Sequence, residues 1–211
     1  MTTSTCYSSV DDGTVWSYDA TYATAREGAS QTAGPSISVG QDNQFLIYEG
    51  FLDLDTSVVG TDDVSAATLS LWLISDFSTT DFTVQARLYD WGAGAVASGD
   101  WVAGSALAGY TLLATRASSG IGATGAYKEF TSEAAFPANI NKTGETRLIL
   151  HSDRHSGANQ PTNDEYMTFQ DADYAGTTRD PKLVVVHAAA PAGHGPSPAL
   201  VLQAVQRSAV M

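Results

Sequence analysis

Four aromatic residues surround one glycine-rich stretch, and half-exposed aromatic rings are among the groups with which proteins bind the flat faces of sugars. Trp91 and Trp101 bound a segment rich in Gly and Ala, and Tyr89 and Tyr110 flank it. Tryptophan also packs often in the cores of β-sandwiches, and this second interpretation is the commoner role of such residues. The sequence leaves both roles open, and names these four residues as the candidate contacts for a glycan.

Two histidines, His151 and His155, are four residues apart, a spacing that brings imidazoles together only on a helix. They come where an alternating segment runs out into Ser, Asp, Gly and Asn, so we expect a polar loop rather than a metal site. His187 and His194 lie at a strand end and in a linker, and they add no third ligand at a recognisable spacing.

Pairs of aspartates raise the possibility of glycoside hydrolysis, which needs two carboxyl groups that face each other across a sugar. Alternate residues of a strand point in parallel, so such pairs do not by themselves converge. The motif Gly-x-Ser-x-Gly is absent, and no Ser, His and Asp order is distinctive. We therefore expect a protein that is not an enzyme. The pairs are Asp53 with Asp55, Asp62 with Asp63, and Asp171 with Asp173.

Acidic loop residues could also bind calcium, which prefers carboxylate, amide and carbonyl oxygens. The candidate ligands are Asn163, Asp164, Glu165, Asp171 and Asp173. Because no Asp-x-Asp-x-Asp-Gly loop is present, the sequence favours a solvated acidic rim and no cofactor, with a structural calcium as the less favoured alternative.

The elements that must position these residues are strands, because apolar and polar residues alternate along most of the chain. Phe82, Val84, Ala86 and Leu88 share one face, and Thr, Gln and Arg occupy the other. Turn-forming residues (Gly, Asp, Ser, Asn and Pro) separate the short alternating segments, as in an antiparallel β-sandwich. Strands are expected at residues 14–18, 45–54, 69–74, 82–88, 110–116, 126–130, 146–151, 165–170 and 182–187, and one helical turn at 132–136.

Composition restricts the partners. The 211 residues include 23 Asp and Glu against 10 Lys and Arg, a net charge of −13, which disfavours nucleic acids and anionic membranes. Cys6 is the single cysteine, so no disulfide can form within the chain. No apolar run reaches the length of a membrane span, and the first residues lack the features of a secretory signal, so we expect the chain to fold in a cytoplasm.

The last two dozen residues differ in composition from the rest. Residues 188–198 are rich in Pro, Gly and Ala, as linkers are, and residues 199–211 are apolar with one charge. An apolar segment on a linker either packs on its own domain or docks on a neighbouring subunit, since its surface must be buried somewhere. The candidate docking residues are Leu200, Val201, Leu202, Val205 and Val210.

Several segments, taken in order, resemble the DNRLRE-type carbohydrate-binding-like jelly-roll domains. An Asp before a short strand (12–16) is followed by Phe-Leu-Asp-Leu (51–54) and Ala-Thr-Leu-Ser-Leu (67–71). A strand that leads into two spaced tryptophans comes next (84–101), and Pro-Lys-Leu-Val-Val (181–185) closes the series. The resemblance spans about residues 12–187 and implies a jelly-roll β-sandwich, which occurs in secreted bacterial proteins and in phage virion proteins.

The resemblance and the composition together predict a non-enzymatic structural component of a bacteriophage virion. We expect a homo-oligomer whose partners are other virion proteins, assembled in the host cytoplasm and located in the virion. An N-terminal arm (1–11) and the apolar tail would reach neighbouring subunits, and Trp72, which alternates out of the leucine face, would cover a surface between subunits. The alternative function is a carbohydrate-binding module that recognises surface glycans.

Overall fold

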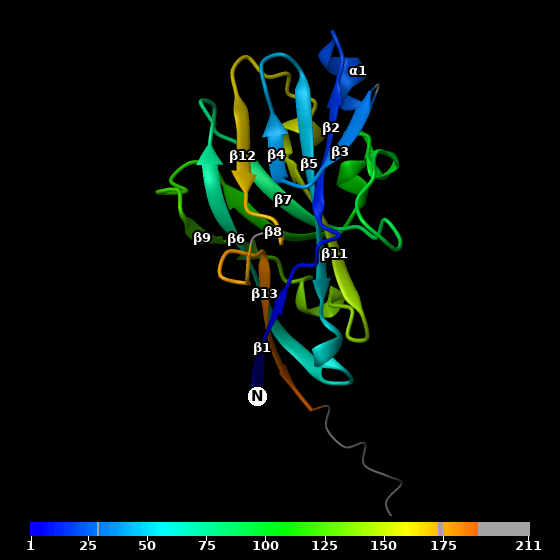
Figure 1. Ribbon diagram of the computed structural model, residues 1–211, viewed down its shortest axis with the longest axis vertical. Coiled ribbons are helices and arrows are strands. Elements are labelled where there is room, and N and C mark those ends of the chain that lie inside the picture. Colours follow the sequence, from blue (N-terminus) through cyan, green and yellow to red (C-terminus); the bar gives the residue numbers. More distant parts are fainter. Residues whose placement is uncertain (29, 173–174, 190–211) are drawn as a thin grey trace, which may run out of the picture.

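The structure, a computed structural model, describes residues 1–28, 30–172 and 175–189, and this part of the chain forms an all-β antiparallel sandwich (Figure 1). Two short helices, α1 (Tyr22–Arg26) and α2 (Asp153–Ser156), lie between strands. The strands are β1 (Thr2–Tyr7), β2 (Gly13–Tyr18), β3 (Gln31–Gly34), β4 (Ile37–Gln41), β5 (Leu46–Asp55), β6 (Asp63–Asp76), β7 (Thr83–Leu88), β8 (Leu112–Ala117), β9 (Ala126–Glu129), β10 (Thr131–Ser132), β11 (Glu145–Ser152), β12 (Glu165–Phe169) and β13 (Lys182–Ala188).

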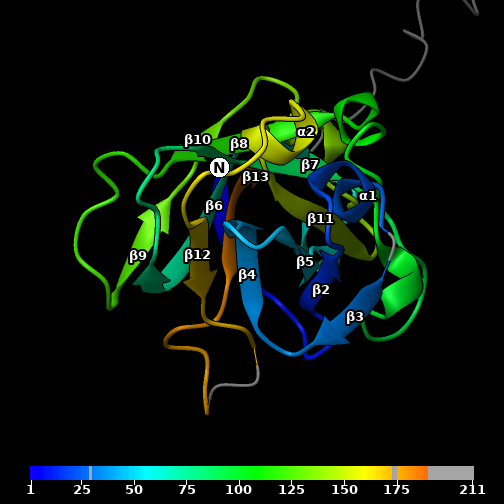
Figure 2. The ribbon, with the colours of Figure 1, turned by 90° about the horizontal axis from the view of Figure 1, so that it is seen from above.

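The strands form one large sheet that curls on itself. Its order is β1-β13-β6-β12-β4-β5-β11-β7-β8-β10, and β2 joins β5 to β3. The segment that holds β9 and β10 closes the curl, because β9 pairs with β6 while β10 pairs with β8. Seen from above, the strands therefore surround a common interior (Figure 2).

The main core fills this interior with the apolar side chains that alternate along the strands. Leu69, Leu71 and Leu73 of β6 are fully buried there, as the period of two predicts. β5 and β11 differ, because they bury side chains on both faces. Leu52 enters the main core, while Phe51 belongs to a second, smaller core on the outer face.

The fold class expected from the sequence is confirmed, with differences at particular elements. The long strand β6 begins at Asp63, before the predicted segment 69–74, and β3, β4 and β10 were not predicted. The single turn expected at 132–136 is shorter than predicted: residues 131–132 form β10, the Phe136 N–H donates to the Glu133 carbonyl at 3.0 Å, and a 3-10 turn follows at Pro137–Asn139.

The two ends of the chain also differ from the expectation. Residues 1–11 were expected to be an arm outside the sandwich, but Thr2–Tyr7 form β1, which pairs along its length with β13. Residue 188, expected to begin a linker, still belongs to β13, because Ala188 pairs with Asp63. The expected docking residues Leu200, Val201, Leu202, Val205 and Val210 lie outside the described residues.

None of the helices in the described ranges has the length and apolar character needed to cross a membrane.

Candidate functional site

The segment between β7 and β8, residues 89–111, folds over the outer face of the sheet. Val102 and Leu107 of this segment are buried against Phe51 of β5 and Ile149 of β11, and Val15 of β2 completes this second core. Burial of apolar side chains on both sides of β5 fixes the segment in place. It thus carries its aromatic residues to the surface above β5 and β11.

The structure packs all four aromatic candidates against the second core, and the rings of three of them contact one another or Phe51. The rings of Tyr89 and Tyr110 meet edge to face at 5.1 Å, and the ring of Trp91 contacts Phe51 edge to face at 5.5 Å. Tyr89, Trp91 and Tyr110 are each partly buried and pack on the second core. One side of each ring therefore packs on the core, and the exposed remainder of the ring can contact a ligand.

Trp101 packs on the second core too, but it also contacts a third cluster of buried residues, Tyr22, Ala25 and Ile47. Its ring lies 5.4 Å from that of His155, and a Cβ added at Gly28 would overlap the indole. The indole is thus held between α1 and α2 as packing, so Trp101 is a weaker candidate for sugar contact than Trp91.

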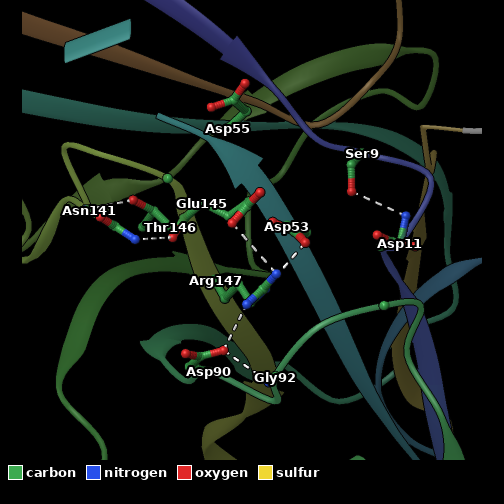
Figure 3. A network of polar contacts seen from close by, with 12 residues as sticks. Ser9, Asp11, Asp53, Asp55, Asp90, Gly92, Asn141, Glu145, Thr146 and Arg147 are labelled. Carbon is green, nitrogen blue, oxygen red and sulfur yellow. Dashed lines mark hydrogen bonds and ion pairs between the residues drawn. The ribbon is translucent and has the colours of Figure 1, made fainter. Parts of the chain in front are cut away.

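Arg147 of β11 is the centre of a polar network beside Trp91 (Figure 3). Its Nε donates to Asp53 at 3.2 Å, its Nη1 donates to Asp90 at 2.9 Å, and Nη2 lies 3.7 Å from Glu145. The guanidinium carbon also lies 5.5 Å from the centre of the Trp91 ring, within the range of a cation–π contact. Arg147 thereby links the aromatic group to three carboxylates.

A cavity of about 330 Å³ opens next to this network. Its volume is near the lower end of the range of small-molecule sites, roughly 300–1,000 Å³. Its lining combines charged, amide and apolar groups, namely Leu88, Asp90, Ala138, Asn139, Ile140, Asn141, Glu145, Thr146 and Arg147. A cavity of this size suits one small polar ring better than an extended polymer.

The two carboxylates on Arg147 have different environments. Desolvation raises the pKa of Asp53, although the Arg147 charge opposes this, and the Asp53 side chain is 2% exposed. The hydrogen bonds from the Gly92 backbone N–H and from Arg147 lower the pKa of Asp90, which is 75% exposed. Asp53 therefore binds the guanidinium on its buried side, while Asp90 presents an ionised carboxylate to solvent.

This arrangement is equipped for recognition of a polyhydroxylated ring. Carboxylates accept hydrogen bonds from hydroxyl groups, amide and guanidinium groups donate to ring and hydroxyl oxygens, and an aromatic face covers the apolar side of the ring. Arg147 pairs with Asp53, Asp90 and Glu145, so one positive charge offsets part of the negative charge of this group.

The histidines of the sequence analysis are not in a polar loop, and that prediction is wrong. His151 and His155 are both buried, because β11 continues through Ser152 and α2 follows at once. Desolvation lowers the pKa of His151 to about 3 and that of His155 to about 4. In the described part of the chain, no group of three or more His, Cys, Asp or Glu side chains is placed to hold a metal ion.

The segments proposed for calcium have other contacts. Glu165 is fully buried and pairs with Arg154, and Gln41 donates to it at 2.8 Å. Asp171 accepts a hydrogen bond from Gln170 at 3.1 Å, and Asp173 lies outside the described residues. Glu165 is therefore part of the interior rather than of an acidic rim.

A second surface feature, the outer strip, consists of Trp72 and Ile74 on β6, Phe77 just after it, Tyr127 on β9 and Tyr166 on β12. The rings of Trp72 and Tyr127 meet edge to face at 5.3 Å, and those of Phe77 and Tyr166 stack at 4.7 Å. Ile74 is 41% exposed and Phe77 is 45% exposed. The prediction that Trp72 faces outward from the leucine face thus agrees with the structure.

Asp90, Glu145 and Arg147 were not among the candidate residues that the sequence pattern indicates. Arg147 sits at a polar position of an alternating strand, where an exposed, unpaired side chain is the ordinary expectation. Its role depends on the fold of residues 89–111 over the outer face, and no local pattern indicates that fold.

Comparison with known proteins adds little to this geometry. No family model and no curated protein matches the chain. Among solved structures, the chain is similar to the Eiger TNF from S. frugiperda, with 12% sequence identity and a TM-score of 0.32 over 92% of this chain and 97% of that one. A similarity at this level carries no inference about function.

Proposed function

We propose that the protein is a structural component of a bacteriophage virion, such as a head or tail adaptor, a decoration protein or a fibre-like protein, and that it acts through contacts between subunits. The resemblance to jelly-roll domains of virion proteins motivates this proposal. The observation that supports it is the outer strip, an exposed apolar surface on an otherwise strongly acidic protein.

The outer strip is suited to contact with a second copy of the chain. Its rings are already ordered by their contacts with one another, so little side-chain freedom is lost on association. Arg179 and Lys182 lie over the Trp72 and Tyr127 rings. These cations lie at the strip itself, and they reduce the repulsion between two acidic copies.

Light scattering during size-exclusion chromatography tests this role. We expect the wild-type chain to form a homo-oligomer, and Ile74→Asp together with Phe77→Asp to give monomers with unchanged circular dichroism. Val58→Asp is the matched control, because Val58 is 60% exposed on a different part of the chain. A wild-type monomer, or an oligomer that survives the paired substitution, would contradict the proposal. Mass spectrometry of purified phage particles tests the location itself.

The second candidate is a carbohydrate-binding module, and the Arg147 site favours it. The Arg147 guanidinium and the exposed Asp90 carboxylate line the cavity, and the Trp91 ring lies against the guanidinium next to it. This role and the first are compatible, because the outer strip and the Arg147 site involve different strands. Both roles act by binding and require no chemical step.

A glycan array with the full chain tests the second candidate. We expect a bound glycan whose affinity falls about tenfold on Trp91→Ala, the loss of one aromatic contact. Asn139→Asp, which adds a charge to the cavity lining, should also weaken binding. Trp72→Ala is the matched control, since it also removes a tryptophan side chain, but from the outer strip instead of the Arg147 site. Equal binding by all three variants, or binding of no glycan by the wild-type chain, would eliminate this candidate.

A further inference from the structure

Ser4, His187 and Asp62 form a hydrogen-bonded chain at the end of the sandwich where the N-terminus lies. Nε2 of His187 is 2.9 Å from Oγ of Ser4, and Nδ1 of His187 is 2.7 Å from Oδ2 of Asp62. The residues come from β1, from β13 and from the turn before β6, which lie side by side in this region (Figure 1). Serine, histidine and aspartate linked in this order are the arrangement of nucleophilic hydrolysis.

The strand register explains how residues so distant in sequence meet. Thr2 pairs with His187, so Ser4 is the diagonal neighbour of His187 on the same face of the sheet. On the other side of β13, Val64 pairs with His187, which places the preceding turn and Asp62 next to the imidazole. The alignment follows from two strand pairings and needs no flexible loop.

The hydrogen bonds define the role that each group can take. A carboxylate accepts a hydrogen bond from Nδ1–H of the imidazole. The lone pair of Nε2 then points toward the hydroxyl group of Ser4. The His187 side chain is 6% exposed and that of Asp62 is 27% exposed, while Ser4 is partly exposed. The imidazole is thus held in one orientation by buried surroundings, and the hydroxyl remains within reach of solvent.

Some backbone N–H groups next to Ser4 take no part in the pairing of β1 with β13. β1 is the last strand on its side of the sheet, and the N–H group of Ser8, which follows it, donates to the carbonyl of Pro181. Since N–H groups alternate in direction along an antiparallel strand, those of Thr3 and Thr5 point toward the free edge. Donors of this kind stabilise the negative oxygen that forms when a carbonyl group is attacked.

We propose that Ser4, His187 and Asp62 form a nucleophilic triad that takes up the acyl group of a carboxylic ester. Oγ of Ser4 attacks the carbonyl carbon while Nε2 of His187 accepts the hydroxyl proton. The bond between that carbon and the alkoxy oxygen then breaks, and the proton on Nε2 passes to the departing alcohol. Water, deprotonated by His187, finally cleaves the acyl group from Ser4 and restores the hydroxyl.

The position of Ser4 selects the substrate class. An edge strand at the end of the molecule sets no upper limit on the size of the alcohol part, so an ester on a large polymer can approach. The activity goes beyond both proposed functions and does not depend on either. It also runs against the expectation of a non-enzymatic protein, which relied on the absence of a distinctive order of Ser, His and Asp in the sequence.

A tagged fluorophosphonate and p-nitrophenyl acetate test the triad in the full chain. We expect the fluorophosphonate to modify one serine, which peptide mapping identifies as Ser4, and Ser4→Ala to abolish the modification. His187→Gln should slow both modification and ester cleavage by at least about 100-fold, the usual contribution of a general base. Ser65→Ala is the matched control, because Ser65 donates to a backbone carbonyl of the neighbouring β13 and has no histidine partner.

A comparison of native and urea-unfolded wild-type protein makes the test independent of whether any variant folds. Faster modification of the native chain at Ser4 supports the triad. Equal rates in the two states, modification at another serine, or no modification of the native chain would overturn it and leave the three residues as hydrogen bonds that close the end of the core. None of these outcomes bears on the oligomer or on glycan binding.

Discussion

Glu49 shows how strongly the second core changes a single residue. It lies at an alternating position of β5, yet it is fully buried, because residues 89–111 cover this face. Its Oε2 accepts a hydrogen bond from the Val102 N–H at 3.0 Å, and its Oε1 lies 3.6 Å from Nδ1 of His155. Desolvation raises the pKa of Glu49 well above 4.5, while burial lowers that of His155 to about 4. Burial therefore favours the neutral form of both groups in the folded protein.

Glu49→Gln should remove a pH dependence of stability. Below pH 4.5 the folded and unfolded chains both hold the Glu49 proton. As the pH rises above that, the unfolded chain loses it while the folded chain keeps it, so the stability from Glu49 falls. Glutamine keeps the acceptor for Val102 and cannot ionise. The free energy of unfolding is measured in urea for the variant and the wild type. We expect the difference between them, variant minus wild type, to rise by at least about 1 kcal/mol from pH 5 to pH 8.

The comparison with the wild-type protein at each pH largely separates the effect of Glu49 from that of the buried histidines. His151 and His155 remain uncharged in the folded state, so they make both proteins less stable as the pH falls from 6.5. The effect of His151 cancels in the difference between variant and wild type, whereas His155 lies 3.6 Å from Glu49 and its effect cancels only in part. A difference that stays constant with pH would show that Glu49 is ionised in the folded protein.

At the scale of the elements, the period of two predicted most strands but not what lies on their outer faces. Alternation shows that Leu148 and Leu150 of β11 share the main core. It does not show that Ile149 and Arg147, on the opposite face, meet a second layer. The aromatic residues of that layer were recognisable in the sequence, whereas the carboxylates that they approach became apparent only with the fold of residues 89–111.

A substitution of Gly40 in β4 tests the register between β4 and β12. Its φ is +124°, and an added Cβ would overlap the backbone oxygen of Glu165 in the paired strand β12. Gly40→Ala should therefore cost at least about 3 kcal/mol in the free energy of unfolding, because both strain and a backbone clash oppose it. Gly92→Ala has a similar φ of +95° but open space around it, so it should cost only about 1 kcal/mol. Equal losses in chemical denaturation would mean that β4 and β12 are not paired in this register.

On the scale of the whole molecule, the acidic charge and the apolar surfaces have opposite effects on association. Two copies of a chain with a net charge of −13 repel each other, whereas burial of the outer strip draws them together. The strip follows β6, β9 and β12, and the Arg147 site follows β5 and β11, which lie on different sides of the curled sheet (Figure 2). An oligomer built on the strip therefore leaves the candidate glycan site accessible.

Deletion of residues 190–211 separates the contribution of the tail from that of the outer strip. Because β13 ends at Ala188, the deletion leaves every strand of the described residues intact, and we expect the midpoint of thermal unfolding to change by less than about 2 °C. If the tail docks on a neighbouring subunit, the shortened chain should be monomeric in light scattering at concentrations where the full chain is an oligomer. Higher salt should restore part of the assembly, because it screens the repulsion between acidic copies while the strip remains. A shortened chain that assembles as the full chain does would assign the contacts to the strip alone, and a large fall in the midpoint would show that the tail packs on its own domain.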